Sequence, residues 1–104
     1  MSFDYTIERS GDTIVVSPEG DLDIDNAALL RQVLQQVLDR GDCTHVEIDM
    51  SAVTFLDSSG LGILVAARRA ARSRGATLHL REPGPVVRMV LEVTNLYDDF
   101  VATT

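Results

Sequence analysis

Short stretches in which apolar and polar residues alternate constrain the fold of this chain more than any other sequence feature. The alternation is clear at 3–8, 45–50 and 76–81, and it is the period of a β-strand with one apolar and one polar face. Parallel strands that are buried on both faces would instead be apolar throughout. We therefore expect an α/β fold with a mixed sheet of four to five strands, helices mainly on one face and an open second face.

The first strand, in which Phe3, Tyr5 and Ile7 alternate with polar residues, is expected to be half-buried. A turn at 10–12 predicts a hairpin to a second strand at 13–17, and Pro18 and Gly20 then predict a loop.

Two stretches, 27–38 and 58–73, have the spacing of amphipathic helices. Asp23, Asp25 or Asn26 can cap the first helix, and Gly41 can end it. Between the two helices, 54–56 is either a short strand or an extended approach to the second helix.

A shorter helix is expected near the C-terminus, because Pro85 suits a first helical turn. The residues expected to point inward are Val86, Val87, Val90 and Leu91. Asn95 is expected to take the left-handed conformation that ends this helix, and the tail 96–101 to pack back in a form that the pattern leaves open.

The length of 104 residues predicts one domain over 1–104. No apolar run reaches the roughly 20 residues of a membrane helix, and the N-terminus lacks the features of a signal peptide. The single cysteine, Cys43, cannot form an internal disulfide. We expect a cytoplasmic protein that does not act at a membrane.

The charge of the chain excludes several functions. The net charge is −7 and all nine basic residues are arginine. An acidic chain is a poor ligand for nucleic acid, which requires a positive face. The absence of lysine excludes a Walker-A nucleotide site, Schiff-base chemistry and a lysine general base. It also argues against a phospho-aspartate receiver domain, whose site relies on a lysine.

The stretch D-S-S-G-L-G at 57–62 precedes the second predicted helix. One reading is helix capping, because the first turn leaves backbone N–H groups without partners. The other is functional, because a hydroxyl between a strand end and a helix N-terminus lies where an anion is favoured. A nucleophile elbow is excluded, since no glycine lies two residues before Ser58 or Ser59.

Metal sites are also poorly supported. The acidic stretch that begins at Asp21 resembles a calcium loop but has Asn26 and Gln32 where that loop needs glycine and glutamate. Cys43 and His45 lack the second pair of ligands of a zinc site. His45 and His79 are expected on the polar side of their strands, as exposed surface residues.

The order of elements, with E-G-D-L-D at 19–23 and V-T-F-L-D-S-S-G-L-G at 53–62, resembles the anti-sigma factor antagonists, small STAS-domain proteins of bacterial sigma-factor control. The resemblance covers nearly the whole chain. It implies that Ser58 is the phosphoacceptor. The residues it places around Ser58 or at the partner interface are Asp21, Asp23, Asp57, Ser59, Gly60, Leu61 and Arg68.

The resemblance implies a non-enzymatic switch. The unphosphorylated chain would bind an anti-sigma factor that is a serine kinase, and a phosphatase would reverse the modification. ATP and Mg²⁺ would belong to the kinase, so that the chain itself needs no cofactor or metal. Two departures, Asn95-Leu96 in place of Gly-Leu and arginines in place of lysine on the interface helix, leave the partner open. The alternative is a STAS scaffold or sensor that binds a protein or small ligand without phosphorylation.

Overall fold

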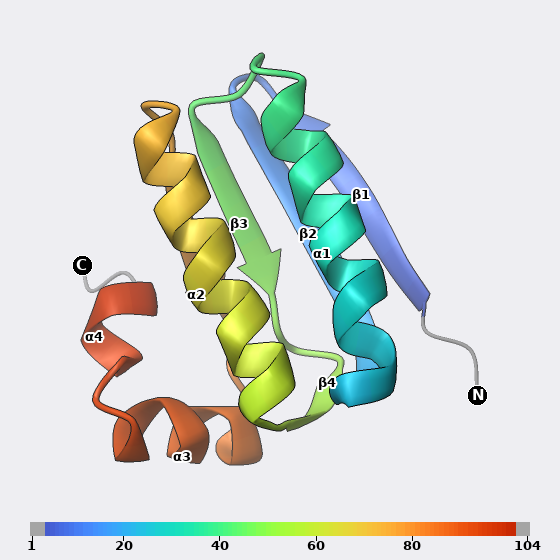
Figure 1. The fold of residues 1–104 in the computed structure, drawn as a ribbon, viewed down its shortest axis with the longest axis vertical. Helices are drawn as coiled ribbons and strands as arrows, with labels where there is room; N and C mark the ends of the chain where they lie inside the picture. Colours follow the sequence, from blue (N-terminus) through green and yellow to red (C-terminus); the bar gives the residue numbers. More distant parts are fainter. Residues whose placement is uncertain (1–3, 102–104) are drawn as a thin grey trace.

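The computed structural model describes residues 4–101 and confirms an α/β fold (Figure 1). The elements, in chain order, are β1 (Asp4–Ser10), β2 (Thr13–Leu22), α1 (Ile24–Asp39), β3 (His45–Asp49), β4 (Val53–Leu56), α2 (Ser58–Ser73), β5 (Thr77–Arg81), α3 (Pro85–Val93) and α4 (Tyr97–Phe100). The four main strands lie in the order β1-β2-β3-β5, and β4 pairs with the end of β2. The β1–β2 pair is antiparallel and the other pairs are parallel, as expected for a mixed five-stranded sheet.

Strand β2 continues past the point where the sequence predicted a loop. It pairs with β3 over residues 13–16 and with β4 over residues 20–22. Pro18 therefore lies between the two pairings, where no partner on that side requires its missing N–H. Gly20 has a φ of +95° at the irregularity between the pairings, and its N–H donates to the carbonyl oxygen of Ala52 (2.9 Å). The loop prediction was wrong because β2 exchanges one neighbour for another at this point.

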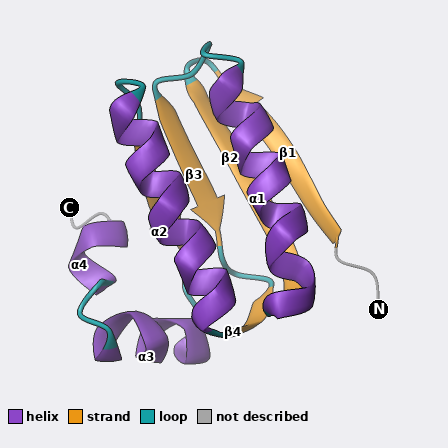
Figure 2. Cartoon of the chain, in the orientation of Figure 1, coloured by secondary structure: helices purple, strands orange, loops and turns teal. Residues whose placement is uncertain are grey.

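Helices α1 and α2 lie side by side on one face of the sheet, while α3 and α4 lie at its end and edge (Figure 2). Leucine and valine side chains of α1 and leucine and alanine side chains of α2 are buried against the apolar side of β2, β3 and β5. Burial of a leucine side chain stabilises the fold by about 1.5–3 kcal/mol. The largest core side chains include Leu22, Leu30, Leu34, Ile48, Met50, Leu64, Leu80, Leu91 and Phe100.

The opposite face of the sheet is polar, as the alternation predicted. Arg81 forms ion pairs with Glu47 (3.2 Å) and Asp49 (3.3 Å) on the neighbouring strand. Burial raises the pKa of the Asp49 carboxyl, but hydrogen bonds from Ser51 and the Arg81 guanidinium outweigh burial and hold that pKa below its usual range.

The two histidines also lie on this polar face, with ring centroids 5.7 Å apart. His45 Nδ1 lies 2.7 Å from the Thr77 hydroxyl. Both histidines are half-buried rather than exposed, because β3 and β5 are neighbours and shield each other's side chains.

Strand β1 differs from the half-buried strand that the sequence predicted. All seven of its residues are exposed, including Tyr5 and Ile7; Phe3 lies outside the described residues. Helix α1 covers β2 but leaves β1 at the edge of the sheet (Figure 1). A groove of about 400 Å³ therefore runs between them, lined by Ile7 with Val33 and Val37 of α1.

The C-terminal part follows the prediction with one exception. Val87 and Leu91 are buried and Val90 is half-buried, but Val86 is 41% exposed. Only one face of α3 contacts the core, and Val86 lies on a different face of this helix. Asn95 has a φ of +61°, as predicted. The tail forms the short helix α4, whose Phe100 is buried.

Candidate functional site

Two strand-to-helix junctions meet at one end of the sheet. Strands β2 and β4 run parallel and end opposite each other, with Leu22 paired to Leu56. The next residues are Asp23, before α1, and Asp57, before α2. The Asp57 N–H donates a hydrogen bond to the Leu22 carbonyl oxygen (3.2 Å). The two acidic junctions that the sequence singled out therefore lie next to each other.

Both aspartates cap the helices that follow them. Asp23 Oδ1 accepts from the N–H groups of Asp25 (3.0 Å) and Asn26 (3.2 Å), so Asp23 is the N-cap among the three candidates. Asp57 Oδ1 accepts from the N–H groups of Ser59 (2.8 Å) and Gly60 (3.1 Å). Each carboxylate thus satisfies two donors of a first helical turn.

Ser58 is the first residue of α2, and its side chain is exposed. Its hydroxyl forms no hydrogen bond with any residue of the described range 4–101. Ser59, the next residue, is half-buried. Of the two hydroxyls, Ser58 is therefore the more accessible to a modifying enzyme.

Gly60 and Leu61, which follow the two serines on α2, pack against the interior next to this site. Gly60 is buried, and a Cβ atom at this position would lie 2.5 Å from the Leu22 carbonyl oxygen and 2.9 Å from Leu56 Cδ1. The glycine therefore lets the first turn of α2 approach the end of β2 closely. Leu61 is half-buried and packs against the core.

Asp21 is held in place by residues that the sequence did not single out for this role. Its Oδ1 accepts a hydrogen bond from the Thr54 hydroxyl of β4 (2.6 Å). Its carbonyl oxygen accepts one from the Asn26 side-chain amide (2.7 Å). The available sequence signal was that Thr54 lies within the motif at 53–62 and that Asn26 follows the motif at 19–23.

Arg68 does not lie beside Ser58. It is ten residues further along α2, which places it about 15 Å away at 1.5 Å per residue. Its guanidinium lies over the Phe100 ring, 5.8 Å from the ring centroid, so that α2 contacts α4 through it.

Comparison with known proteins identifies the family. A family model described as "Mlab, STAS domain" matches residues 5–102. The chain belongs to the STAS-domain family. The anti-sigma-B factor antagonist of Listeria monocytogenes is 30% identical to this STAS domain over 91 residues, which are 88% of this chain and 79% of that protein. The resemblance seen in the sequence is thereby confirmed.

Solved structures agree with this assignment. The anti-sigma factor antagonist from Mycobacterium paratuberculosis has a TM-score of 0.82 at 30% identity, covering 98% of this chain and 87% of that one. The anti-sigma factor antagonist SpoIIAA has the same fold in its unphosphorylated form (TM-score 0.82, 24% identity, 97% of this chain and 89% of that one). The phosphorylated form of SpoIIAA also matches (TM-score 0.75, 22% identity, 97% and 92%). The Listeria protein, the Mycobacterium protein and SpoIIAA are thus all named as antagonists of anti-sigma factors.

Large apolar side chains are exposed at the end of the STAS domain that carries Ser58. We call this set the apolar rim: Ile24, Phe55, Val86, Met89 and Val93, of which Ile24 and Val93 are 73% and 80% exposed. Helix α3 packs against β4, and the starts of α1 and α2 lie at the same end of the molecule (Figure 1).

The apolar rim was not predicted from the sequence, although a signal was present. Ile24 is apolar but lies outside the apolar stripe of α1, because its helical neighbours at 28 and 31 do not belong to that stripe. On α3, Val86, Met89 and Val93 follow a separate i, i+3, i+7 pattern.

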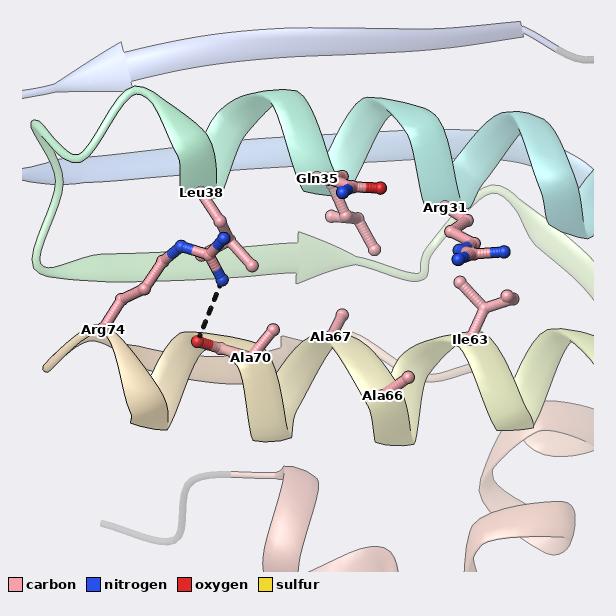
Figure 3. Close-up of a pocket in the computed structure, with 9 residues that line it drawn as sticks. Arg31, Gln35, Leu38, Ile63, Ala66, Ala67, Ala70 and Arg74 are labelled. Atoms are coloured by element: carbon pink, nitrogen blue, oxygen red, sulfur yellow. Dashed lines mark hydrogen bonds between the residues drawn. The ribbon is translucent and has the colours of Figure 1, made fainter.

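A separate hollow of about 200 Å³ lies between α1 and α2 of the STAS domain (Figure 3). Its lining residues on α2 begin at Ile63, so that it follows the later turns of the helix rather than the first. At its far end, Arg74 donates to the Ala70 carbonyl oxygen (3.4 Å) and pairs with Asp39 (2.7 Å). This hollow is not part of the site at Ser58.

Two further findings concern the described residues alone. No group of three or more potential metal-ligating side chains comes together within residues 4–101. None of the helices in that range is long and apolar enough to cross a membrane.

Proposed function

We propose that this chain is an anti-sigma factor antagonist whose binding to an anti-sigma factor is switched by phosphorylation of Ser58. The observation that carries the proposal is the exposed Ser58 hydroxyl at the start of α2, which has no hydrogen-bond partner among residues 4–101 and lies next to two acidic junctions and the apolar rim. The apolar rim supports a docking role, because its exposed apolar side chains come from elements that meet at the end of the molecule that carries Ser58.

The caps explain why a phosphoryl group would act on the partner rather than on the fold. A helix N-terminus normally attracts a phosphate through its free N–H groups. Here the Asp57 carboxylate already accepts from Ser59 and Gly60. A phosphoryl group on Ser58 adds a charge of about −1.5 to −2 at pH 7. That charge would remain largely unneutralised beside Asp23 and Asp57, and a docked partner would have to desolvate it.

The binding cycle follows from this electrostatic argument. The unmodified chain binds the anti-sigma factor and frees the sigma factor. The anti-sigma factor is itself a serine kinase, which supplies ATP and Mg²⁺ and phosphorylates Ser58. The chain acts as a substrate and not as an enzyme, it is located in the cytoplasm, and a phosphatase resets it. A loss of about 3 kcal/mol on phosphorylation would weaken binding more than a hundredfold.

The site assignment can be tested by mass spectrometry. The chain is incubated with candidate anti-sigma kinases and Mg-ATP, and a gain of about 80 Da, one phosphoryl group, is mapped by peptide. We expect the gain on Ser58 in the native chain and in a Ser59→Ala variant, and no gain in Ser58→Ala. Modification at Ser59 would move the site by one residue. No modification by any kinase that binds the chain would favour the alternative of a scaffold that works without phosphorylation.

Binding measured by calorimetry tests the switch and the apolar rim. Ser58→Ala should bind the anti-sigma factor like the native chain, and Ser58→Asp should bind more weakly. Met89→Glu, on the apolar rim, should also weaken binding. The matched control is Ser73→Glu, which adds the same charge at the opposite end of α2. Equal effects of Met89→Glu and Ser73→Glu would exclude the apolar rim as the docking surface.

A further inference from the structure

The hollow between α1 and α2 exists because the two helices face each other with side chains of different size. Helix α1 contributes Leu34 and Leu38, both of which are buried. Helix α2 contributes the small side chains of Ala67 and Ala70, with Ile63 at one end of the hollow (Figure 3). Alanine side chains are too short to fill the space opposite the leucines. An open apolar hollow of about 200 Å³ therefore remains between the helices.

One end of the hollow carries a free positive charge. Arg31 of α1 lines this end, and its side chain and that of Ile63 on α2 point toward one another across the gap (Figure 3). The Arg31 guanidinium forms no hydrogen bond or ion pair with any residue of the range 4–101. Arg9, Arg74 and Arg81, in contrast, are paired with carboxylates. None of the nine lining residues is acidic, so that Arg31 is available to an anion in the hollow.

The two ends of the hollow are not equivalent. At the end opposite Arg31, the Arg74 guanidinium donates to the Ala70 carbonyl oxygen (3.4 Å) and pairs with Asp39 (2.7 Å). The Asp39 carboxylate already neutralises this guanidinium. A ligand with one negative group is therefore favoured with that group at Arg31 and an uncharged end near Arg74.

We infer that the hollow binds a medium-chain aliphatic carboxylate, with the carboxylate at Arg31 and the chain along the alanine face of α2. Arg31 and Leu38 are seven residues apart on α1, which is about 10 Å at 1.5 Å per residue. An extended chain advances about 1.2 Å per bond, so that eight carbons span roughly 8 Å. A cavity of about 150 Å³ holds benzene, and a hollow of 200 Å³ has room for a chain of six to eight carbons.

The charge and the chain of such a ligand contribute separately to binding. A guanidinium holds a carboxylate through two parallel N–H···O hydrogen bonds. Because Arg31 is exposed, water and salt weaken this contact, and it strengthens binding by about three- to fivefold. Each CH₂ group that leaves water strengthens binding by up to about fourfold. The net charge of −7 disfavours anions in general, but at physiological ionic strength it is screened beyond about 8 Å.

This binding site goes beyond the proposed function and does not depend on it. The lining of the hollow on α2 begins at Ile63, whereas the proposed switch lies at Ser58 in the first turn. The binding assay contains no kinase and no protein partner. Failure of one proposal would therefore leave the other standing.

Isothermal titration calorimetry of the full chain with sodium butanoate, hexanoate and octanoate tests the class of ligand. We expect saturable binding of octanoate at millimolar or lower concentration, with a Kd that falls by up to about fourfold per CH₂ along the series. Hexanol, which has the chain of hexanoate without its charge, should bind about three- to fivefold more weakly than hexanoate. No saturable binding of octanoate, no gain in affinity along the series, or equal affinity for hexanoate and hexanol would overturn the inference.

Two variants and one control test the position of the ligand. Arg31→Gln should remove the preference for hexanoate over hexanol. Arg69→Gln, the matched change at an exposed arginine of α2 that does not line the hollow, should preserve it. Ala70→Leu fills the hollow and should abolish octanoate binding, and circular dichroism checks that this variant folds. Equal effects of Arg31→Gln and Arg69→Gln, or undiminished octanoate binding by a folded Ala70→Leu variant, would contradict the site.

Nuclear magnetic resonance of the native chain locates the ligand without any substitution. We expect the backbone amide shifts caused by octanoate to cluster at 31–38 and 63–70, the segments that line the hollow. Shifts confined to the apolar rim, or to the groove between β1 and α1, would place the ligand elsewhere and overturn the inference.

Discussion

Replacement of Gly60 by alanine is the most direct test of how the site is packed. A Cβ atom at Gly60 would lie 2.5 Å from the Leu22 carbonyl oxygen and 3.0 Å from Leu22 Cβ. The first neighbour is a backbone atom that also accepts the Asp57 N–H hydrogen bond, so it cannot move without disturbing the junction. Overpacking of this kind costs about 1–3 kcal/mol. In an open helical position the same replacement would instead stabilise the chain by about 0.5–1 kcal/mol.

Gly62 provides the matched control within the same helix. Apart from its chain neighbours and the nearby backbone of α2, no atom of the described residues lies within 4 Å of a Cβ built at Gly62. We therefore expect Gly62→Ala to raise the free energy of unfolding and Gly60→Ala to lower it. Urea denaturation followed by circular dichroism measures both. With a slope of about 1–3 kcal/mol per M urea, a loss of about 2 kcal/mol shifts the midpoint by roughly 1 M. A Gly60→Ala variant as stable as Gly62→Ala would refute the close approach of α2 to β2.

Two further predictions concern single carboxylates. Asp57→Ala removes the acceptor for two backbone N–H groups and should lower the free energy of unfolding by about 1 kcal/mol. Asp57→Asn can still cap the helix and should lower it less. Equal decreases for the two variants in urea denaturation would contradict the capping role. Asp49 has a lowered pKa, so its stabilising effect is present above its unfolded pKa of about 3.9 and is lost as the pH falls through the lower folded value. The free energy of unfolding of Asp49→Asn should therefore be lower than that of the native chain at pH 7, by about 1 kcal/mol, and this difference should disappear on acidification. A difference that does not change with pH would contradict the ion pair with Arg81.

The sequence predicted best those features that depend on neighbouring residues. The bounds predicted for the second helix, 58–73, are those of α2, because Asp57 caps its first turn and Gly75 follows its end. Asn95 adopts positive φ where a helix needs to end. Alternation correctly predicted the polar face of the sheet, since each strand carries its own pattern.

Features that depend on distant residues could not be predicted in this way. Alternation in β1 could not reveal that its residues are left exposed, since that depends on where α1 packs. The continuation of β2 through Pro18 depends on two different neighbouring strands. The proximity of Asp23 to Asp57 followed from the family resemblance, and local patterns alone would have left both as ordinary caps. Arg68, which the resemblance assigned to the interface helix, lies ten residues beyond Ser58 on α2.

The parallel arrangement of α1 and α2 sets the electrostatic balance of one pole of the molecule. Both helices begin at that pole, and each contributes roughly half a positive charge there. The two capping carboxylates outweigh this contribution, and Asp25 in the first turn of α1 adds further negative charge. A phosphoryl group on Ser58 would add a charge of about −1.5 to −2 at the same pole. The modification would thus make an already negative pole more negative without the movement of any helix.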